Sequence, residues 1–170
     1  MAFFIKDNIE IHPMAYIAPS VRIYGQVKIG AYASIWDGVV IRGDMSPIEI
    51  GEGTSIQENA VIHVDTDIPT KIGSYVTVGH SAVIHGATVG EHCIIAIKSA
   101  VLNNAVIGDY SVVGAGAIVM EGHVIPPKSV VFGIPGKVVK TITEEMKKDI
   151  EKNANVYVEL GKAYKLRKIE

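Results

Sequence analysis

The sequence predicts an all-β fold, a single-stranded parallel β-helix of hexapeptide repeats with an α-helix packed along it at the C-terminal end. Three observations predict this fold. Ile or Val recurs at every sixth residue over most of the chain, glycine recurs at intervals of 17 to 22 residues, and a helical pattern replaces both near the C-terminus. The repeat is interpreted first, because a fixed period identifies architectures made of stacked units.

The aliphatic repeat is interrupted only by two short insertions and one deleted residue. Neither the helical period of about 3.6 residues nor the alternation of an antiparallel strand fits a period of six. β-branched residues favour short strands, so three hexapeptides make one coil with three flat faces. An ordinary β-sandwich is the alternative, but it needs alternating strands with turns at about every 8–12 residues. The repeat positions are Ile11, Ile17, Ile23, Ile29, Ile35, Ile41, Ile50, Ile56, Ile62, Ile72, Val78, Ile84, Val89, Ile95, Val101, Ile107, Val113, Val119 and Ile125.

The residue four places after each repeat position is usually small, as at Ala15, Ala33, Thr88 and Cys93. Stacked coils lie about 4.8 Å apart, so these rows and the aliphatic rows interlock into one continuous core. We therefore interpret Cys93 as a packing residue and not as a nucleophile. A single cysteine also excludes an intrachain disulfide and favours a reducing compartment.

The repeat ends at Pro126, and a helical pattern begins near Thr141. Either Thr141 with Glu144, or Thr143, can cap a helix there. One apolar stripe then follows a helical spacing. We therefore divide the chain into a β-helix domain, residues 1–136, and a C-terminal helix, residues 137–170, packed on its outside. The stripe consists of Met146, Ile150, Tyr157, Leu160 and Tyr164.

The composition argues against nucleic-acid and membrane partners. The 170 residues carry 16 basic and 18 acidic side chains, a net charge of −2. No strongly basic face is implied, so nucleic acid and anionic membranes are poor candidates as partners. No apolar run approaches the ~18 residues of a membrane helix, and residues 1–7 lack the pattern of a signal peptide. A cytoplasmic location is therefore expected.

Three histidines are candidates for a metal site. When the coils are written above one another, His63 and His85 become neighbours, because each follows the aliphatic residue of the same face. Two imidazoles about one strand spacing apart can share one metal ion at about 2.0–2.1 Å from each nitrogen. His80 lies on another face and cannot readily reach that point.

A second copy of the chain would complete this set of ligands. If a neighbouring subunit docks its His80 against the face that holds His63 and His85, and a threefold rotation closes the ring, each boundary gains three histidines. Three histidines with an open fourth position form the catalytic zinc arrangement. The alternative is that surface histidines are only solvated. The other three histidines, which have no comparable partners, fit that interpretation: His12, His92 and His123.

Several motifs along the chain carry a family resemblance. They are Arg42-Gly43-Asp44, Ser55-Ile56-Gln57-Glu58-Asn59, Ile62-His63, Gly79-His80, Ile84-His85-Gly86, Gly133-Ile134-Pro135-Gly136, and a helix with Asn153-Ala154 and Tyr157-Val158-Glu159-Leu160. With these motifs the chain resembles the gamma-class carbonic anhydrase family over nearly its whole length. Hexapeptides alone are shared with many acyltransferases, but the histidine spacings of 17 and 5 residues together with Arg-Gly-Asp are specific.

The resemblance implies a left-handed β-helix that forms a homotrimer. It implies a metal ion, Zn²⁺ or alternatively Fe²⁺ or Co²⁺, held by His63 and His85 of one subunit and His80 of the next. It also implies an enzyme, a lyase that reversibly hydrates carbon dioxide to bicarbonate with a hydroxide held on the metal at the trimer interface.

The resemblance also implies roles for five further residues. Arg42 and Asp44 form an ion pair that helps to assemble the interface, and Gln57 hydrogen-bonds the attacking hydroxide. Glu58 stands where the family commonly has Asp, and it orients a group or accepts a proton. Tyr157 on the helix approaches the site.

The sequence departs from the best-known family members in the groups that carry protons. Met45 follows Arg-Gly-Asp where those members have Glu, and only the brief segment 64–70, with Asp65 and Asp67, follows the first histidine. Slow or absent catalysis is a consequence of this departure. Two alternatives therefore remain: a hexapeptide acyl-CoA transferase or thioesterase with a metal-free catalytic histidine, and a non-catalytic metal-binding trimer that acts as a scaffold.

Overall fold

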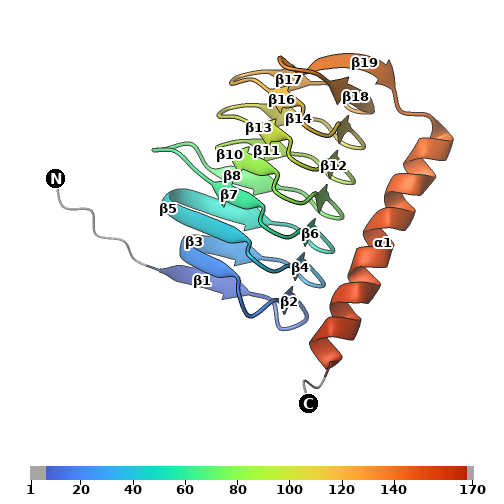
Figure 1. The fold of residues 1–170 in the computed structure, drawn as a ribbon. Coiled ribbons are helices and arrows are strands. Elements are labelled where there is room, and N and C mark those ends of the chain that lie inside the picture. Colours follow the sequence, from blue (N-terminus) through green and yellow to red (C-terminus); the bar gives the residue numbers. More distant parts are fainter. Residues whose placement is uncertain (1–6, 168–170) are drawn as a thin grey trace.

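The chain winds into a left-handed parallel β-helix with three faces, and one long helix runs along its outside (Figure 1). The computed structural model describes residues 7–167. Most of the segment on which the signal-peptide expectation rests, residues 1–6, lies outside the described residues. Strands are parallel throughout the coils, as the six-residue period predicts, and only β18 and β19 pair antiparallel among the described residues.

The strands form two hydrogen-bonded sheets. The larger sheet contains β1 (Asn8–Ile11), β3 (Arg22–Ile29), β5 (Val40–Ile50), β7 (Val61–His63), β8 (Thr70–Ile72), β10 (Val83–His85), β11 (Thr88–Val89), β13 (Ala100–Val101), β14 (Val106–Ile107), β16 (Ile118–Val119) and β17 (Val124–Ile125). The smaller sheet contains β2 (Tyr16–Ile17), β4 (Ser34–Ile35), β6 (Ser55–Ile56), β9 (Thr77–Val78), β12 (Ile94–Ile95), β15 (Val112–Val113), β18 (Ser129–Phe132) and β19 (Lys137–Thr141).

The two sheets make the three faces of the coil. The first face is formed by β1, β8, β11, β14, β17 and the second halves of β3 and β5. The smaller sheet is the second face. The third face is formed by the first halves of β3 and β5 with β7, β10, β13 and β16. β3 and β5 therefore each bend around the corner between the third face and the first.

The interior of the coil is filled by the predicted aliphatic rows. Sixteen of the nineteen repeat residues are buried, and the exceptions are Ile11, Ile17 and Ile23 in the first coil, which no earlier described coil covers. Cys93 is fully buried in the same core, as predicted. Thr88 is exposed, contrary to the prediction, and Ala87 points inward in its place, because the deleted residue shifts the register by one.

Close stacking of the coils explains the recurring glycines. A Cβ at Gly51 would lie 2.5 Å from the carbonyl carbon of Gly73 in the next coil. A Cβ at Gly73 would meet the backbone of Gly90 at 2.8 Å in the same way. These positions therefore require glycine for close backbone approach rather than for binding a ligand.

Helix α1 (Glu144–Leu166) covers the second face (Figure 1). Thr143 caps it by accepting a hydrogen bond from the backbone N–H of Met146 at 3.2 Å, one of the two caps expected. The segment expected to be helical from residue 137 begins instead with strand β19, which pairs with β18. No helix among the described residues is long and apolar enough to span a membrane.

The face of α1 that packs on the coil differs from the predicted stripe at one end. Ile150, Ala154 and Gly161 are buried, whereas Leu160 is 40% exposed. Gly161 makes the contact there because a Cβ on it would already lie 3.0 Å from the Cβ of Ser34. The helix can therefore approach the coil closely at Gly161, because this residue has no side chain.

Candidate metal site

His63 and His85 lie side by side at the end of the third face. Strands β7 and β10 pair in register, with His63 opposite His85, so the predicted ladder neighbours are confirmed. Nδ1 of His63 and Nε2 of His85 face each other at 2.9 Å. His63 is 8% exposed and His85 is half-buried, so both rings lie at the surface without being freely solvated.

The outer nitrogen of His63 is held by an acidic residue. Nε2 of His63 lies 3.3 Å from Oδ1 of Asp44, and Oδ2 of Asp44 accepts a hydrogen bond from Nη1 of Arg42 at 2.6 Å. Burial alone would raise the pKa of Asp44, but the hydrogen bonds from Arg42 and His63 outweigh it and lower that pKa. Asp44 therefore stays a carboxylate, which can only accept, so it favours the tautomer of His63 that carries the proton on Nε2.

Burial also favours the neutral form of His63. It lowers the pKa of the imidazole, and the positive charge of Arg42 lowers it further, whereas the hydrogen bond to Asp44 opposes the change. A neutral imidazole is the form that binds a metal ion. Arg42, Asp44 and His63 thus act as one chain of contacts, and we call them, together with His85, the His63 set.

The outer nitrogen of His85 is held by an amide. Nδ1 of His85 lies 2.6 Å from Oδ1 of Asn103, which comes from the next coil. An amide oxygen accepts, so the proton of His85 is on Nδ1 and its Nε2 presents a lone pair. When His63 is in the tautomer that donates to Asp44, Nδ1 of His63 and Nε2 of His85, which face each other, both present lone pairs.

This arrangement fits a metal ion. Two lone pairs at 2.9 Å repel each other unless a cation or a proton lies between them. A tetrahedral ion bound at about 2.0–2.1 Å needs its two nitrogens about 3.3 Å apart, a change of only a few tenths of an ångström. Neutral imidazoles whose second nitrogen donates to a carboxylate or carbonyl are also the usual ligands of zinc in proteins.

His80 lies at the opposite edge of the third face. Nδ1 of His80 pairs with Oε2 of Glu58 at 2.7 Å, and both side chains are nearly half exposed. The pair leaves Nε2 of His80 free and directed away from its own carboxylate. β10 lies between His80 and His85, and its residues alone span about 7 Å, so His80 does not join the pair formed by His63 and His85 in the same chain.

Gln57 and Tyr157 lie at the same corner as His80. Gln57 follows Ile56 at the end of β6 and is 5% exposed, next to Glu58. Its neighbour in the preceding coil is Trp36, whose indole packs against the ring of Tyr157 with centroids 6.5 Å apart. Tyr157 therefore belongs to the corner of His80 and not to that of the His63 set. We call Gln57, Glu58 and His80 the His80 set.

One chain therefore holds two incomplete halves of the expected site. Among residues 7–167 no group of three or more His, Cys, Asp or Glu side chains is arranged to hold a metal ion.

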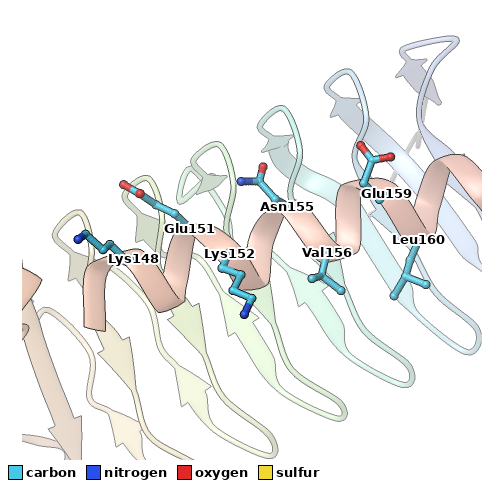
Figure 2. Close-up of a pocket in the computed structure, with 7 residues that line it drawn as sticks. All are labelled: Lys148, Glu151, Lys152, Asn155, Val156, Glu159 and Leu160. Carbon is cyan, nitrogen blue, oxygen red and sulfur yellow. The ribbon is translucent and has the colours of Figure 1, made fainter. Parts of the chain in front are cut away.

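A hollow of about 700 Å³ lies along the outer side of α1, between Glu151 and Asn155 on one ridge and Lys152 and Val156 on the other (Figure 2). All its lining residues are on the helix, and none of the predicted site residues is among them.

Two partners of the histidines are not predicted by the sequence. Asn103 binds His85, and Thr70 donates to the carbonyl of His63 at 2.5 Å. Asp65, which was considered only for proton transfer, accepts from the side chain of Asn103 at 2.9 Å and from the backbone of Thr66 at 2.8 Å. The hydrogen bond from Thr66 lowers the pKa of Asp65 most, and the one from Asn103 lowers it further. Asp65 is therefore a poor proton acceptor near neutral pH. Counting one coil on from His85 leads to Leu102, one residue before Asn103, so the repeat does not identify Asn103 as its partner.

Comparison with known proteins places these features in a family. A model of the bacterial transferase hexapeptide, with six repeats, matches residues 8–43. The chain is 52% identical to a probable carbonic anhydrase of Methanocaldococcus jannaschii, over 85% of this chain and 91% of that protein. It is 39% identical to the mitochondrial gamma carbonic anhydrase 2 of Arabidopsis thaliana, over 88% of this chain but only 56% of that longer protein.

Solved structures share the same architecture. The crystal structure of a putative acetyltransferase from Bacillus cereus has a TM-score of 0.91 and 38% identity, over 92% of this chain and 91% of that one. The relatives thus carry both anhydrase and transferase names, and the probable carbonic anhydrase of M. jannaschii has the higher identity to this chain, 52% against 38%. The chain belongs to the gamma-class carbonic anhydrase family of hexapeptide-repeat proteins.

Proposed function

We propose that the protein is a homotrimeric, metal-dependent carbonic anhydrase whose three sites lie between subunits. In each site His63 and His85 of one subunit and His80 of the next hold a divalent ion, with zinc as the first candidate and iron or cobalt as alternatives. The observation that carries the proposal is that Nδ1 of His63 and Nε2 of His85 face each other 2.9 Å apart. A cytoplasmic location accompanies this proposal as a prediction.

The outward residues of the three faces support a trimer. On the first face they are charged in the early coils, as at Lys28, Glu49 and Lys71, and Thr88, Val106 and Val124 follow in the later coils. On the second face they lie under α1. On the third face they form an apolar column that residues 7–167 leave at least partly exposed: Val40, Val61, Val83, Ala100 and Ile118. An uncovered apolar column on one face is typical of a subunit interface.

The apolar column also lies on the face where two subunits must be in contact if they are to share a metal ion. Val61 and His63 are two residues apart on one strand, so their side chains leave the same face. The His80 set borders the other edge of that face, where the exposed Ile97 follows His80 in the next coil. A threefold arrangement that covers the third face therefore brings the His80 set of one subunit to the His63 set of the next.

Each residue of the two sets has a task in this proposal. A divalent ion held by three imidazoles with an open fourth position lowers the pKa of water toward neutrality and so supplies the hydroxide that hydrates carbon dioxide. Asp44, held by Arg42, orients His63, and Glu58 orients His80. The amide of Gln57 arrives beside His80 and can hydrogen-bond the attacking oxygen. Met45 and the brief segment 64–70 replace the acidic groups that carry protons in the best-known family members, and we therefore expect slow turnover.

Metal analysis combined with a kinetic assay tests the proposal. Protein purified with and without oxygen is analysed for Zn, Fe and Co and assayed for carbon dioxide hydration by stopped flow. We expect up to one ion per subunit in a trimer and hydration above the buffer rate. A trimer that binds none of the three ions, or a metal-loaded trimer without hydration in either preparation, would contradict the assignment.

Acyl-CoA transfer or hydrolysis is a second candidate, favoured by one observation. The pair of Glu58 and His80 has the geometry of a histidine base oriented by a carboxylate. That reaction gives no task to His63 and His85, which lie together at the opposite edge of the third face. Turnover of acetyl-CoA by metal-free protein, lost in His80→Ala and retained in His63→Ala, would favour the transferase.

A further inference from the structure

The loop between β7 and β8 reaches across two coils to a residue behind the metal site. The loop turns at Asp67, which has a positive φ of 59°, and Asp65 and Ile68 form an isolated bridge across it. Oδ2 of Asp65 accepts a hydrogen bond from Nδ2 of Asn103, 38 residues later, at 2.9 Å. The insertion that interrupts the hexapeptide repeat thus brings a carboxylate to Asn103.

The carboxylate determines how the amide of Asn103 is oriented. A carboxylate only accepts hydrogen bonds, so the NH₂ group of Asn103 must face Asp65. The amide oxygen then faces Nδ1 of His85 at 2.6 Å, and His85 must carry its single proton there. Nε2, which faces His63, is left as the lone pair.

The surroundings leave room for this contact. Gly86 has a φ of +58°, and a Cβ on it would lie 2.5 Å from Oδ1 of Asn103 and 2.9 Å from Cγ2 of Ile68. The glycine therefore lets both the amide and the loop approach His85. The backbone N–H of Thr66 donates to Oδ1 of Asp65 at 2.8 Å, which fixes the other carboxylate oxygen.

We propose that Asp65 and Asn103 are positioning residues that hold His85 in the one tautomer whose Nε2 can bind a metal ion. The inference rests on the proposed metal site, and it assigns a task to the loop at residues 64–70 other than proton transfer. Residues that fix a ligand histidine in this way typically change metal affinity by 10–100-fold when they are removed.

The test uses a polarity swap in the full-length protein. In Asp65→Asn the new amide oxygen still accepts from Thr66, so its NH₂ faces Asn103. Asn103 must then turn its oxygen to residue 65 and its NH₂ to His85, which moves the imidazole proton to Nε2. The double variant Asp65→Asn with Asn103→Asp restores an acceptor for Nδ1 of His85. Asp67→Asn is the matched control, because it removes the same charge from the same loop at a position where Asn tolerates the positive φ.

Two measurements are made on each variant. Nitrogen-15 NMR of the metal-free protein above neutral pH reports the tautomer of His85, and chelator competition with Zn²⁺ and with Co²⁺ reports affinity. We expect Asp65→Asn to move the proton to Nε2 and to lower affinity 10–100-fold, the double variant to restore both, and Asp67→Asn to change neither. An unchanged tautomer and affinity in Asp65→Asn would overturn the inference. If the unmodified protein binds neither ion, the proposed function fails, while the NMR readout still supports or overturns the positioning role.

Discussion

Replacement of Val61 by aspartate tests whether the third face is the trimer interface. Val61 points outward from β7, two residues before His63, and is 37% exposed in the single chain. In the proposed trimer that exposed part is covered by the neighbouring subunit. Val61→Asp puts an unpaired carboxylate into this contact without disturbing the interior of the coil, because Ile62 and not Val61 points inward.

The size of the effect follows from the exposed fraction of the side chain. Full burial of a valine is worth about 1.5–3 kcal/mol, so the third that remains exposed contributes roughly 0.5–1 kcal/mol per subunit. Desolvating an unpaired carboxylate costs several kcal/mol, taken here as about 3. Three interfaces then lose roughly 10 kcal/mol in total, which lowers the association constant of the trimer by about seven powers of ten.

Sedimentation equilibrium and metal analysis measure this effect. We expect Val61→Asp to be a folded monomer of about 18.2 kDa that no longer retains the metal ion, because a monomer supplies only two of the three histidines. Val106→Asp is the control, since Val106 is 38% exposed and points outward from β14 on the first face. It should remain a trimer with its metal. A trimeric, metal-loaded Val61→Asp, or equal dissociation of both variants, would refute the assignment of the third face.

Three further predictions concern the metal site and the core. His80→Ala should abolish metal binding and hydration. Its unfolding free energy should stay within about 0.5 kcal/mol of that of the unmodified protein when both are metal-free, because the side chain is 47% exposed. Metal analysis and urea unfolding in chelator check this, and full turnover in the variant would exclude His80 as a ligand. Burial raises the pKa of Cys93 to about 12, so iodoacetamide should modify this residue only after unfolding. Mass spectrometry follows the modification, and rapid modification of the native protein would contradict a packing role. Gly51→Ala places a Cβ 2.5 Å from the backbone of Gly73 and should lower the unfolding free energy by about 1–3 kcal/mol. Urea titrations measure this, and an unchanged midpoint would show that adjacent coils can move apart.

The six-residue period predicted most of the fold because one physical requirement repeats along it. Each Ile or Val must point inward and stack on the equivalent residue of the next coil, so a count along the sequence also places outward residues. For this reason Ile62 and Ile84 were enough to predict that His63 and His85 lie side by side. The same count predicted wrongly that Thr88 points inward, because the residue deleted before Val89 also shifts the row of small residues by one position.

The features that the sequence did not predict depend on the insertions and the ends of the repeat. The contact between Asp65 and Asn103 needs the shape of the loop, which is set by the turn at Asp67 and by Ile68 packing over Gly86. No period relates these residues. Strand β19 lies in the segment that the sequence predicts to be helical, because antiparallel pairing after the turn at 133–136 has no counterpart in the repeat.

Division of the site between subunits makes metal binding and assembly thermodynamically dependent on each other. An ion that binds the trimer but not the monomer stabilises each site by about 2.7 kcal/mol at a free concentration of 100 times its dissociation constant. Three sites then supply roughly 8 kcal/mol, nearly as much as the loss estimated for Val61→Asp. A milder change such as Val61→Ala, which removes only apolar contact, should therefore dissociate on chelation and reassemble when Zn²⁺ is returned. If its oligomeric state did not respond to zinc, the three histidines would not bridge subunits, even if each chain bound metal.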